Sequence, residues 1–114
     1  MPMANVYYKS WGDTGSLKVP KLQAYLASRL SCGDIKLRPD EVSVRLIAAK
    51  DESAMLGRIE VDITAHAFPD RVRDQDKICY DVKEWLRKEA SIADPRVWLQ
   101  LCQLGHDVIP KLSR

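Results

Sequence analysis

Residues 58–67 read RIEVDITAHA, and the alternation within this stretch decides the fold. Apolar side chains occupy every second position, at Ile59, Val61, Ile63 and Ala65, and polar side chains stand between them. Strict alternation of this kind predicts a β-strand that buries one face and turns a chemically different face away from the core. The other elements can be predicted outward from this strand.

A helix and a second strand are predicted after it. Apolar residues recur at helical spacing at Ile78, Val82 and Leu86, and the tripeptide ADP ends that helix. Residues 96–104 (RVWLQLCQL) then alternate again, which predicts another strand. The second half of the chain therefore has the order strand, helix, strand.

The first half has the same order. Residues 4–9 (ANVYYK) have the composition of a short strand, and apolar residues recur at helical spacing from Val19 to Leu30. Residues 41–49 (EVSVRLIAA) alternate as a second strand, and the two halves superpose with an offset of about 55 residues. We therefore predict an α+β fold in which two βαβ units form a four-stranded sheet with two helices on one face.

Two architectures share this order of elements. One is the ferredoxin-like split βαβ sandwich, and in the other the strands of each unit are parallel neighbours. In both, the face of the sheet without helices carries a mixed set of side chains, namely Arg45, Ile47, Glu60, Asp62, Thr64, His66, Trp98, Gln100 and Cys102. Such a face is more simply buried against copies of the same chain, so we expect an oligomer.

Length and composition limit the other possibilities. The 114 residues predict one domain, with βαβ units at 1–49 and 57–104, a linker at 50–56 and a C-terminal tail at 105–114. The formal charge is only +2 and the basic residues are dispersed, so we expect no nucleic-acid partner. No apolar stretch approaches the roughly 20 residues of a membrane helix, so we expect no membrane partner.

The cysteines and histidines suggest neither disulfides nor metal. Cys32, Cys79 and Cys102 are widely spaced, which is typical of reduced thiols in a cytoplasmic protein. Neither histidine has a partner at metal-ligand spacing, so we predict no metal site. Motifs for nucleotide binding and acyl transfer are missing from the sequence as well.

A resemblance to a known family rests on three features. The chain has a proline directly after its first methionine, two βαβ units, and the segment LRPDEVSVRLI at residues 37–47. Together these resemble the tautomerase superfamily, which includes 4-oxalocrotonate tautomerase (4-OT), 5-carboxymethyl-2-hydroxymuconate isomerase and macrophage migration inhibitory factor. The resemblance implies a homotrimer whose sheets surround a central channel, and keto–enol chemistry without a cofactor.

The resemblance also implies roles for particular residues. Pro2 would be the catalytic base, with its amine exposed by loss of the methionine, and Arg45 in SVR would bind a substrate carboxylate. Arg71, which follows the third strand, would line the site. Trp98 and Gln100 stand where the last strand of the migration inhibitory factor branch supplies a tyrosine and an asparagine. The first-loop arginine of 4-OT has no match in residues 9–18, which argues against the diacid substrates of that enzyme.

The chemistry explains why these residue types suit the reaction. Proton transfer across an enol needs a base that is unprotonated near neutral pH, and an apolar pocket lowers the pKa of an amine. Tyr7, Tyr8, Trp98 and the apolar faces of the strands could supply that pocket. An arginine binds a carboxylate through two parallel hydrogen bonds, which a lysine does less well. The substrate class is therefore a small unsaturated or enolic carboxylic acid.

Several alternatives stay open. Arg45 can instead neutralise Glu60 or Asp62 on the same face, and Arg71 can be a solvated loop arginine. For His66 we expect a structural hydrogen bond rather than catalysis. The whole protein can also be an inactive oligomeric binding protein with the tautomerase fold. A third possibility is a ferredoxin-like dimer that binds small molecules or RNA, although its central strands lack the exposed aromatic residues that RNA binding uses.

Overall fold

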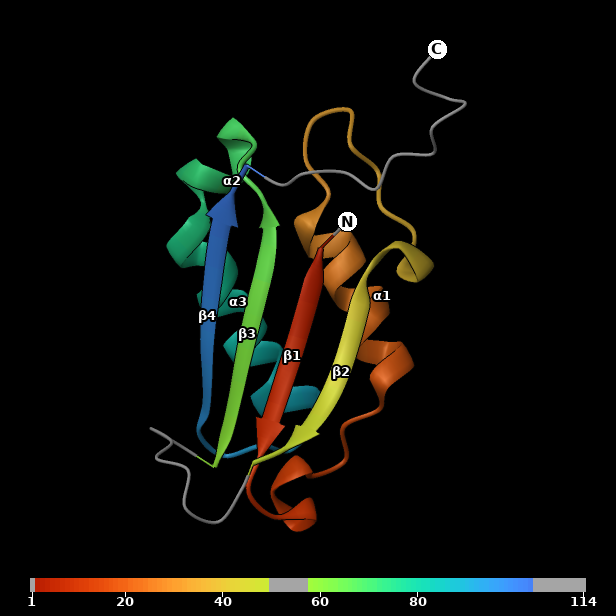
Figure 1. Ribbon diagram of the computed structural model, residues 1–114, viewed down its shortest axis with the longest axis vertical. Helices are drawn as coiled ribbons and strands as arrows, with labels where there is room; N and C mark the ends of the chain where they lie inside the picture. The colour runs from red at the N-terminus through yellow and green to blue at the C-terminus, as the bar shows by residue number, and fades with distance from the viewer. Residues whose placement is uncertain (1, 50–57, 104–114) are drawn as a thin grey trace.

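The computed structural model describes residues 2–49 and 58–103, and they form one mixed sheet with helices packed on it (Figure 1). The first half contains β1 (Met3–Tyr8), α1 (Val19–Leu30) and β2 (Ser43–Ala48). The second half contains β3 (Ile59–His66), the short α2 (Pro69–Arg73), α3 (Gln75–Glu89) and β4 (Pro95–Cys102). Two short 3-10 turns, η1 (Trp11–Thr14) and η2 (Pro39–Glu41), lie in the loops of the first half.

The sheet decides between the two architectures that the sequence allowed. Its strand order is β2-β1-β3-β4. Within each half the two strands are parallel neighbours, and β1 and β3 join the halves as an antiparallel pair. The prediction of two βαβ units in an α+β fold is confirmed, and the ferredoxin-like arrangement is wrong for this chain.

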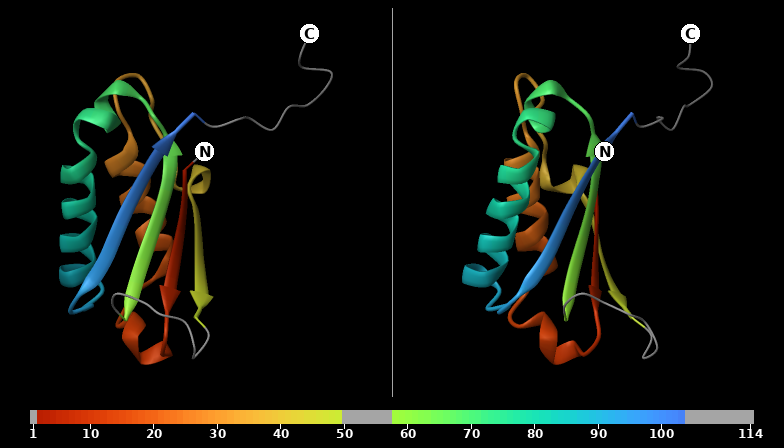
Figure 2. Two further views of the ribbon diagram at one scale, coloured as in Figure 1. Left: turned by 60° about the vertical axis from the view of Figure 1, so that its left-hand side comes forward. Right: turned by 90° about the vertical axis from the view of Figure 1, so that its left-hand side faces the viewer.

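Both long helices cover the same face of the sheet (Figure 2). The side chains between helices and sheet are the ones that alternation and helical spacing selected, and each contributes about 1.5–3 kcal/mol by leaving water. The fully buried members include Val6, Leu22, Leu26, Leu30, Ile59, Val61, Ile63, Ile78, Val82 and Leu86. An ion pair between Arg29 and Asp81, 2.8 Å long, joins α1 to α3 at the edge of this layer.

The segment FPDR at residues 68–71 leads into a short helix. Pro69 is the first residue of α2, where its fixed φ suits a helix and its missing N–H costs no hydrogen bond. Five residues are too few to show a helical period, so the pattern of apolar residues could not reveal this element. The helix fixes the direction in which Arg71 points.

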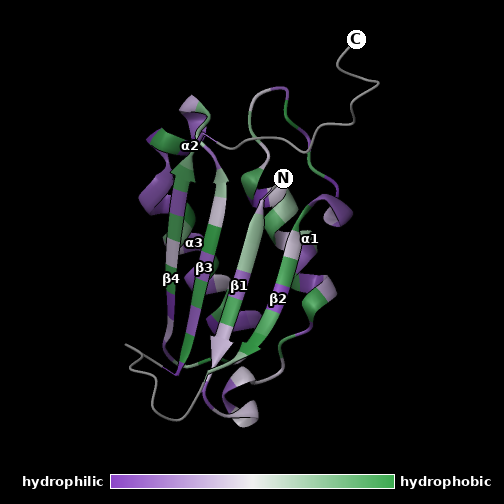
Figure 3. Cartoon of the chain, viewed as in Figure 1, coloured by the Kyte–Doolittle hydropathy of each residue, from purple (hydrophilic) through white to green (hydrophobic). Residues whose placement is uncertain are grey.

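The other face of the sheet carries no helix, and we call it the open face. Figure 3 shows polar and apolar residues alternating along its strands. The register aligns Arg45, Asn5, Asp62 and Trp98 in one row across the four strands. Trp98 is 42% exposed, and Met3 in the next row is 40% exposed. The predicted mixture of charged and apolar side chains on this face is therefore confirmed.

The predicted domain limits stay predictions. The linker at 50–56 and the tail at 105–114 lie outside the described residues.

Candidate functional site

Pro2 lies at the end of the sheet where β1 begins and where β3 and β4 end (Figure 1). It is buried, and its carbonyl oxygen accepts a hydrogen bond of 3.0 Å from the main-chain N–H of Ser43. Because Met3 pairs with Thr64, the register places Pro2 opposite Ala65 on β3. The neighbours Ala4, Val42 and Ala65 are all buried, so the surroundings of Pro2 on the helix side of the sheet are apolar.

Arg71 is buried at the same end of the sheet, and it makes contacts that the sequence did not predict. Its side chain donates two hydrogen bonds to the carbonyl oxygen of Leu30, from Nε at 3.0 Å and from Nη2 at 2.8 Å. Nη1 donates a third, 3.0 Å long, to the carbonyl oxygen of His66. Leu30 ends α1, whose last carbonyl groups have no partner within the helix, and a cation is favourable there. Burial lowers the pKa of the Arg71 guanidinium.

These contacts bear on the two roles considered for Arg71. The residue is only 3% exposed, so the alternative of a solvated loop arginine is wrong. Three of its five N–H donors are directed at main-chain carbonyl groups, which supports a structural role. A cavity of about 150 Å³ lies beside it, between the ends of α1 and α2, and is lined also by Arg29, Cys32 and Arg73. Substrate binding by Arg71 stays a prediction.

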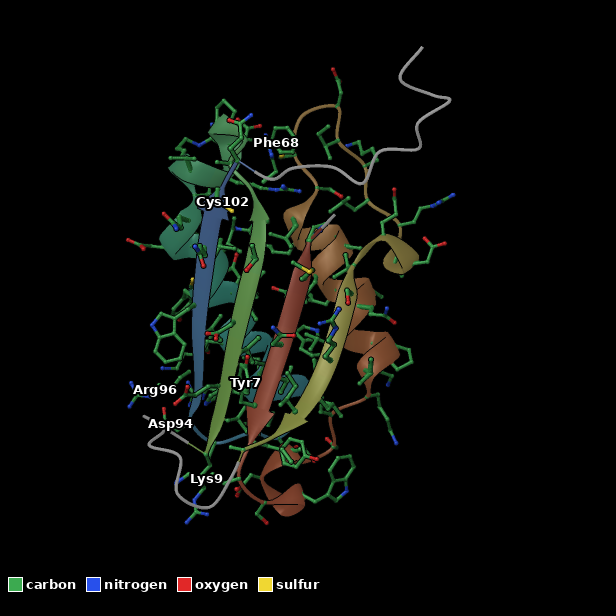
Figure 4. The ribbon with its side chains drawn as sticks, viewed as in Figure 1. Tyr7, Lys9, Phe68, Asp94, Arg96 and Cys102 are labelled. Atoms are coloured by element: carbon green, nitrogen blue, oxygen red, sulfur yellow. The ribbon has the colours of Figure 1, made fainter. Side chains whose placement is uncertain are left out.

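Phe68 links Arg71 to His66, and the sequence analysis missed it. The Phe68 ring lies 4.6 Å from the imidazole of His66, centroid to centroid, and the guanidinium carbon of Arg71 lies 4.9 Å from the Phe68 centroid. Figure 4 shows Phe68 beside the end of β3 and Cys102 at the end of β4. In the sequence, the dipeptide Phe-Pro shortly after a predicted strand is the only local indication that an aromatic ring packs at this end of the sheet.

Arg45, Trp98 and Gln100 all lie on the open face, but one subunit does not bring them together. Arg45 is on the edge strand β2, whereas Trp98 and Gln100 are on the opposite edge strand β4. Three strand spacings of about 4.8 Å separate the two edges, which gives about 14 Å. Arg45 is exposed, and among the described residues its side chain has no ion pair, so the alternative of a pairing with Glu60 or Asp62 is not found there.

The expected aromatic pocket around Pro2 is wrong for a single subunit. Tyr7 and Tyr8 lie at the far end of β1, five and six residues from Pro2, and a strand rises about 3.4 Å per residue. Figure 4 shows Tyr7 near the end of the sheet opposite to Phe68 and Cys102. Tyr8 instead packs edge-on against Trp11, with ring centroids 5.5 Å apart.

Two carboxylates share the middle of the open face. Glu60 and Asp62 are two residues apart on β3 and therefore point the same way. Burial raises the pKa of Asp62, and the neighbouring charge of Glu60 raises it further. Because both groups carry the same charge, each disfavours ionisation of the other.

Other features of the described residues add little to this site. A cavity of about 440 Å³ lies at the opposite end of the sheet, near Asp13, Arg58 and Asp94. Within residues 2–49 and 58–103 no three histidine, cysteine or acidic side chains are close enough to hold a metal ion. None of the helices in these ranges has the length and apolar character needed to cross a membrane.

Comparisons with known proteins were made on sequence and on structure. No protein-family model and no curated protein sequence matches the chain. A protein of unknown function from Vibrio cholerae is similar in structure, with a TM-score of 0.63 and 17% identity over 95% of this chain and 83% of that chain.

Two further similar structures have names that indicate their protein family. A macrophage migration inhibitory factor-like protein from Entamoeba histolytica matches with a TM-score of 0.55 and 12% identity, over 93% of this chain and 95% of that chain. A fused 4-OT asymmetric trimer matches with a TM-score of 0.57 and 14% identity, over 98% and 99%. At these identities the likeness concerns the fold alone, and it agrees with the resemblance found in the sequence. The chain therefore has the fold of the tautomerase superfamily.

Proposed function

We propose that the chain is a cofactor-independent keto–enol tautomerase or isomerase, with the amine of Pro2 as general base. The observation that carries the proposal is the position of Pro2. It is buried among apolar residues at the start of the central strand β1, in a chain with the tautomerase fold. Once Met1 is removed, Pro2 carries a free secondary amine. Apolar surroundings disfavour the ammonium form, so they lower the pKa of such an amine toward neutrality.

The reaction needs a base and a fixed cation. The unprotonated amine takes the proton from the enol oxygen of the substrate, and the ammonium ion returns a proton to the carbon at the other end of the enol C=C bond, which leaves the keto form and the free amine. Arg45 has no ion-pair partner among the described residues, so its guanidinium is available for the carboxylate of a small enolic acid. Trp98 and Gln100 would contact the rest of that substrate.

The same geometry supports an oligomer. Arg45 and Trp98 stand at opposite edges of the sheet, about 14 Å apart, which is too far for one small substrate to touch both. A neighbouring copy on the open face would supply the missing residue and cover Met3 and Trp98, which are exposed in the single subunit. The 4-OT structure is described as a trimer, and we propose a homotrimer here.

The first experiment compares two preparations of the same chain. One begins at Pro2, as intact mass will show, and the other keeps one or more residues before Pro2, which converts the amine to an amide. Ketonisation of phenylpyruvate is expected only from the preparation that begins at Pro2. Pro20→Ala is the matched control, because it changes a proline in the first turn of α1, away from the proposed base. Equal activity in both preparations would exclude Pro2 as the base.

An inactive oligomeric binding protein is the second candidate. Two observations favour it: the hydrogen bonds of Arg71 are directed at carbonyl groups, and Tyr7 and Tyr8 lie far from Pro2. The same comparison decides between the two functions. No activity above buffer from a chain that begins at Pro2, together with a stable oligomer in light scattering, would establish the binding protein.

A further inference from the structure

One main-chain peptide group connects the helix α1 to Pro2. The carbonyl oxygen of Val42 accepts a hydrogen bond of 2.9 Å from Nε2 of Gln23 on α1. The N–H of the same peptide group belongs to Ser43, and it donates the 3.0 Å hydrogen bond to the carbonyl oxygen of Pro2. Gln23, this peptide group and Pro2 therefore form one continuous chain of hydrogen bonds.

The members of this chain of hydrogen bonds are held in place by their surroundings. Gln23 is half-buried and follows Leu22, which is fully buried against the sheet, so α1 fixes the position from which its side chain reaches out. In Figure 1, α1 lies behind β1 and β2, which is the arrangement that the contact needs. Val42 is 1% exposed, and its own N–H donates a hydrogen bond of 3.1 Å to the carbonyl oxygen of Pro39. A carbonyl oxygen can only accept, so the amide nitrogen of Gln23 faces Val42 rather than the amide oxygen.

A base at the first residue of a chain depends on such support. In a chain that begins at Pro2 no residue precedes the ring, so the direction of the amine is set by the packing of the ring and by the groups that hold the Pro2 carbonyl group. Once the plane of that carbonyl group is fixed, the amine can turn only about the bond between Cα and the carbonyl carbon. The N–H of Ser43 holds this plane, and Gln23 strengthens the hydrogen bond, because a peptide group that accepts at its oxygen is a better donor at its nitrogen.

We propose that Gln23 is a positioning residue for the Pro2 amine: by binding the carbonyl group of Val42, it fixes the peptide group that orients Pro2 for proton transfer. This inference rests on the proposed function, because the direction of the amine matters only if the amine is the base. Gln23 acts through Val42 and Ser43 and takes no part in the proton transfer itself. A misplacement of about 1 Å in a reacting group can lower a rate about 100-fold, so a contact at this distance from the amine can affect the reaction.

The second half of the chain contains a matched contact. Gln75 at the start of α3 donates a hydrogen bond of 2.8 Å from Nε2 to the main-chain carbonyl oxygen of Leu99 on β4. Both glutamines are half-buried, and both join a helix to the main chain at an edge strand of the sheet. The strand β3 separates β4 from β1, so the contact of Gln75 does not lead to Pro2. Loss of either glutamine should have a similar cost in stability, but only loss of Gln23 should affect the amine.

Amide hydrogen exchange, followed by NMR, tests the connection without a substrate, in protein that begins at Pro2. In Gln23→Met, exchange of the Ser43 amide should become about 10-fold faster relative to the amide of Val61 in the centre of β3, because the contact opens locally. In Gln75→Met the two amides should keep their wild-type ratio of exchange rates. An unchanged ratio in Gln23→Met would overturn the inference.

Steady-state kinetics with phenylpyruvate separates positioning from a purely structural role. Gln23→Met should lower kcat about 10-fold or more with little change in KM, because the amine is misdirected while Arg45 still binds the carboxylate. Gln75→Met should keep both constants near those of the wild type. A rise in KM with kcat retained would mean that Gln23 supports Arg45 instead of the base, and the inference would be wrong.

Gln23→Glu repeats both measurements with a side chain of the same size that lacks the donor at neutral pH. A folding defect specific to the methionine variant, seen in circular dichroism, therefore does not decide the result. If a chain that begins at Pro2 is inactive, the proposed function fails, and with it the role of Gln23 in proton transfer. The exchange of the Ser43 amide still tests, in that case, whether Gln23 holds the contact to Pro2.

Discussion

Arg71 donates two hydrogen bonds to the carbonyl oxygen of Leu30, a residue 41 positions earlier in the chain. The contact joins the start of the second helical segment to the end of α1, and a third hydrogen bond ties the same guanidinium to the end of β3. One buried cation thus connects the two βαβ units at the end of the molecule where Pro2 lies. Within residues 2–49 and 58–103 the hydrogen-bond partners of its side chain are carbonyl groups, and these, with the negative end of the α1 dipole, compensate its charge.

The first prediction concerns this contact. Arg71→Met removes the donors and leaves the carbonyl groups of Leu30 and His66 without them, so we expect a loss of about 3 kcal/mol in the free energy of unfolding, measured by urea denaturation. Arg71→Lys should recover less than half of the loss, because one ammonium group cannot make the hydrogen bonds that the planar guanidinium donates to two carbonyl groups. Arg73→Met is the matched control, since Arg73 lies on the same short helix, is exposed and should leave stability near wild type. Equal stability of the two methionine variants would mean that the contact contributes nothing.

The second prediction separates Arg45 from the other arginine of the open face. Arg45→Ala should raise KM for an enolic carboxylic acid about 10- to 100-fold, because a charge-assisted hydrogen bond to a carboxylate contributes about 1.5–3 kcal/mol. Arg96→Ala is the control, because Arg96 lies on the same face near the end of the sheet opposite to Pro2 and pairs with Asp94. Steady-state kinetics on both variants gives the answer. A similar rise in KM for the two variants would point to a general effect of surface charge.

The sequence predicted the strands well because each has one buried and one open face. The alternation in residues 58–67 predicted β3 to within one residue at each end, and helical spacing placed α1 at Val19–Leu30. The strand order was not predictable, since the ferredoxin-like arrangement and the observed one bury the same residues. It depends on the antiparallel pairing of β1 with β3, which alternation does not specify.

The candidate site was predictable only in part. Pro2 and Arg45 followed from a resemblance in short motifs; Pro2 directly precedes β1, and Arg45 lies in the adjacent strand β2. The partners of Arg71 could not be predicted, because they are main-chain carbonyl groups. Every residue has such a group, so the sequence does not indicate which ones accept a hydrogen bond. The position of Pro2 opposite Ala65 likewise depends on the register between two strands that are about 60 residues apart in the chain.

The third prediction concerns the loop after β1. Gly15 has φ +58°, and a Cβ atom at this position would collide with the main-chain oxygen of Ala90, which already accepts a hydrogen bond of 2.9 Å from the N–H of Ser16. Gly15→Ala should therefore lower the free energy of unfolding by about 2 kcal/mol or more, from backbone strain and from the displaced end of α3. Gly12→Ala is the control, because its Cβ would meet only the Ser10 hydroxyl at 3.8 Å. Thermal unfolding of both variants tests this, and a Gly15→Ala protein as stable as Gly12→Ala would contradict it.

The last prediction contrasts two aspartates whose pKa values move in opposite directions. Burial opposes ionisation of Asp81, but hydrogen bonds from Arg29 and Lys77 outweigh it and lower the pKa of Asp81. A lowered pKa means that the unfolded chain binds the proton more tightly, so this carboxylate stabilises the fold above its unfolded pKa and the stabilisation is lost as the pH falls below that value. Asp81→Asn should therefore cost up to about 1 kcal/mol at pH 7 and progressively less in acid.

The pKa of Asp62 is shifted in the opposite direction, and its effect on stability has the opposite sign. Burial and the charge of Glu60 raise its pKa, so the folded state binds the proton more tightly than the unfolded chain and stability falls as the pH rises through that range. Asp62→Asn should therefore stabilise the fold slightly at pH 7, and the gain should disappear below the unfolded pKa. Urea denaturation of both variants at pH 7 and at pH 3 measures the two effects on one scale, at a protein concentration low enough to keep the chain monomeric. A loss of stability from Asp62→Asn at pH 7 would show that its carboxylate has a favourable partner on the open face.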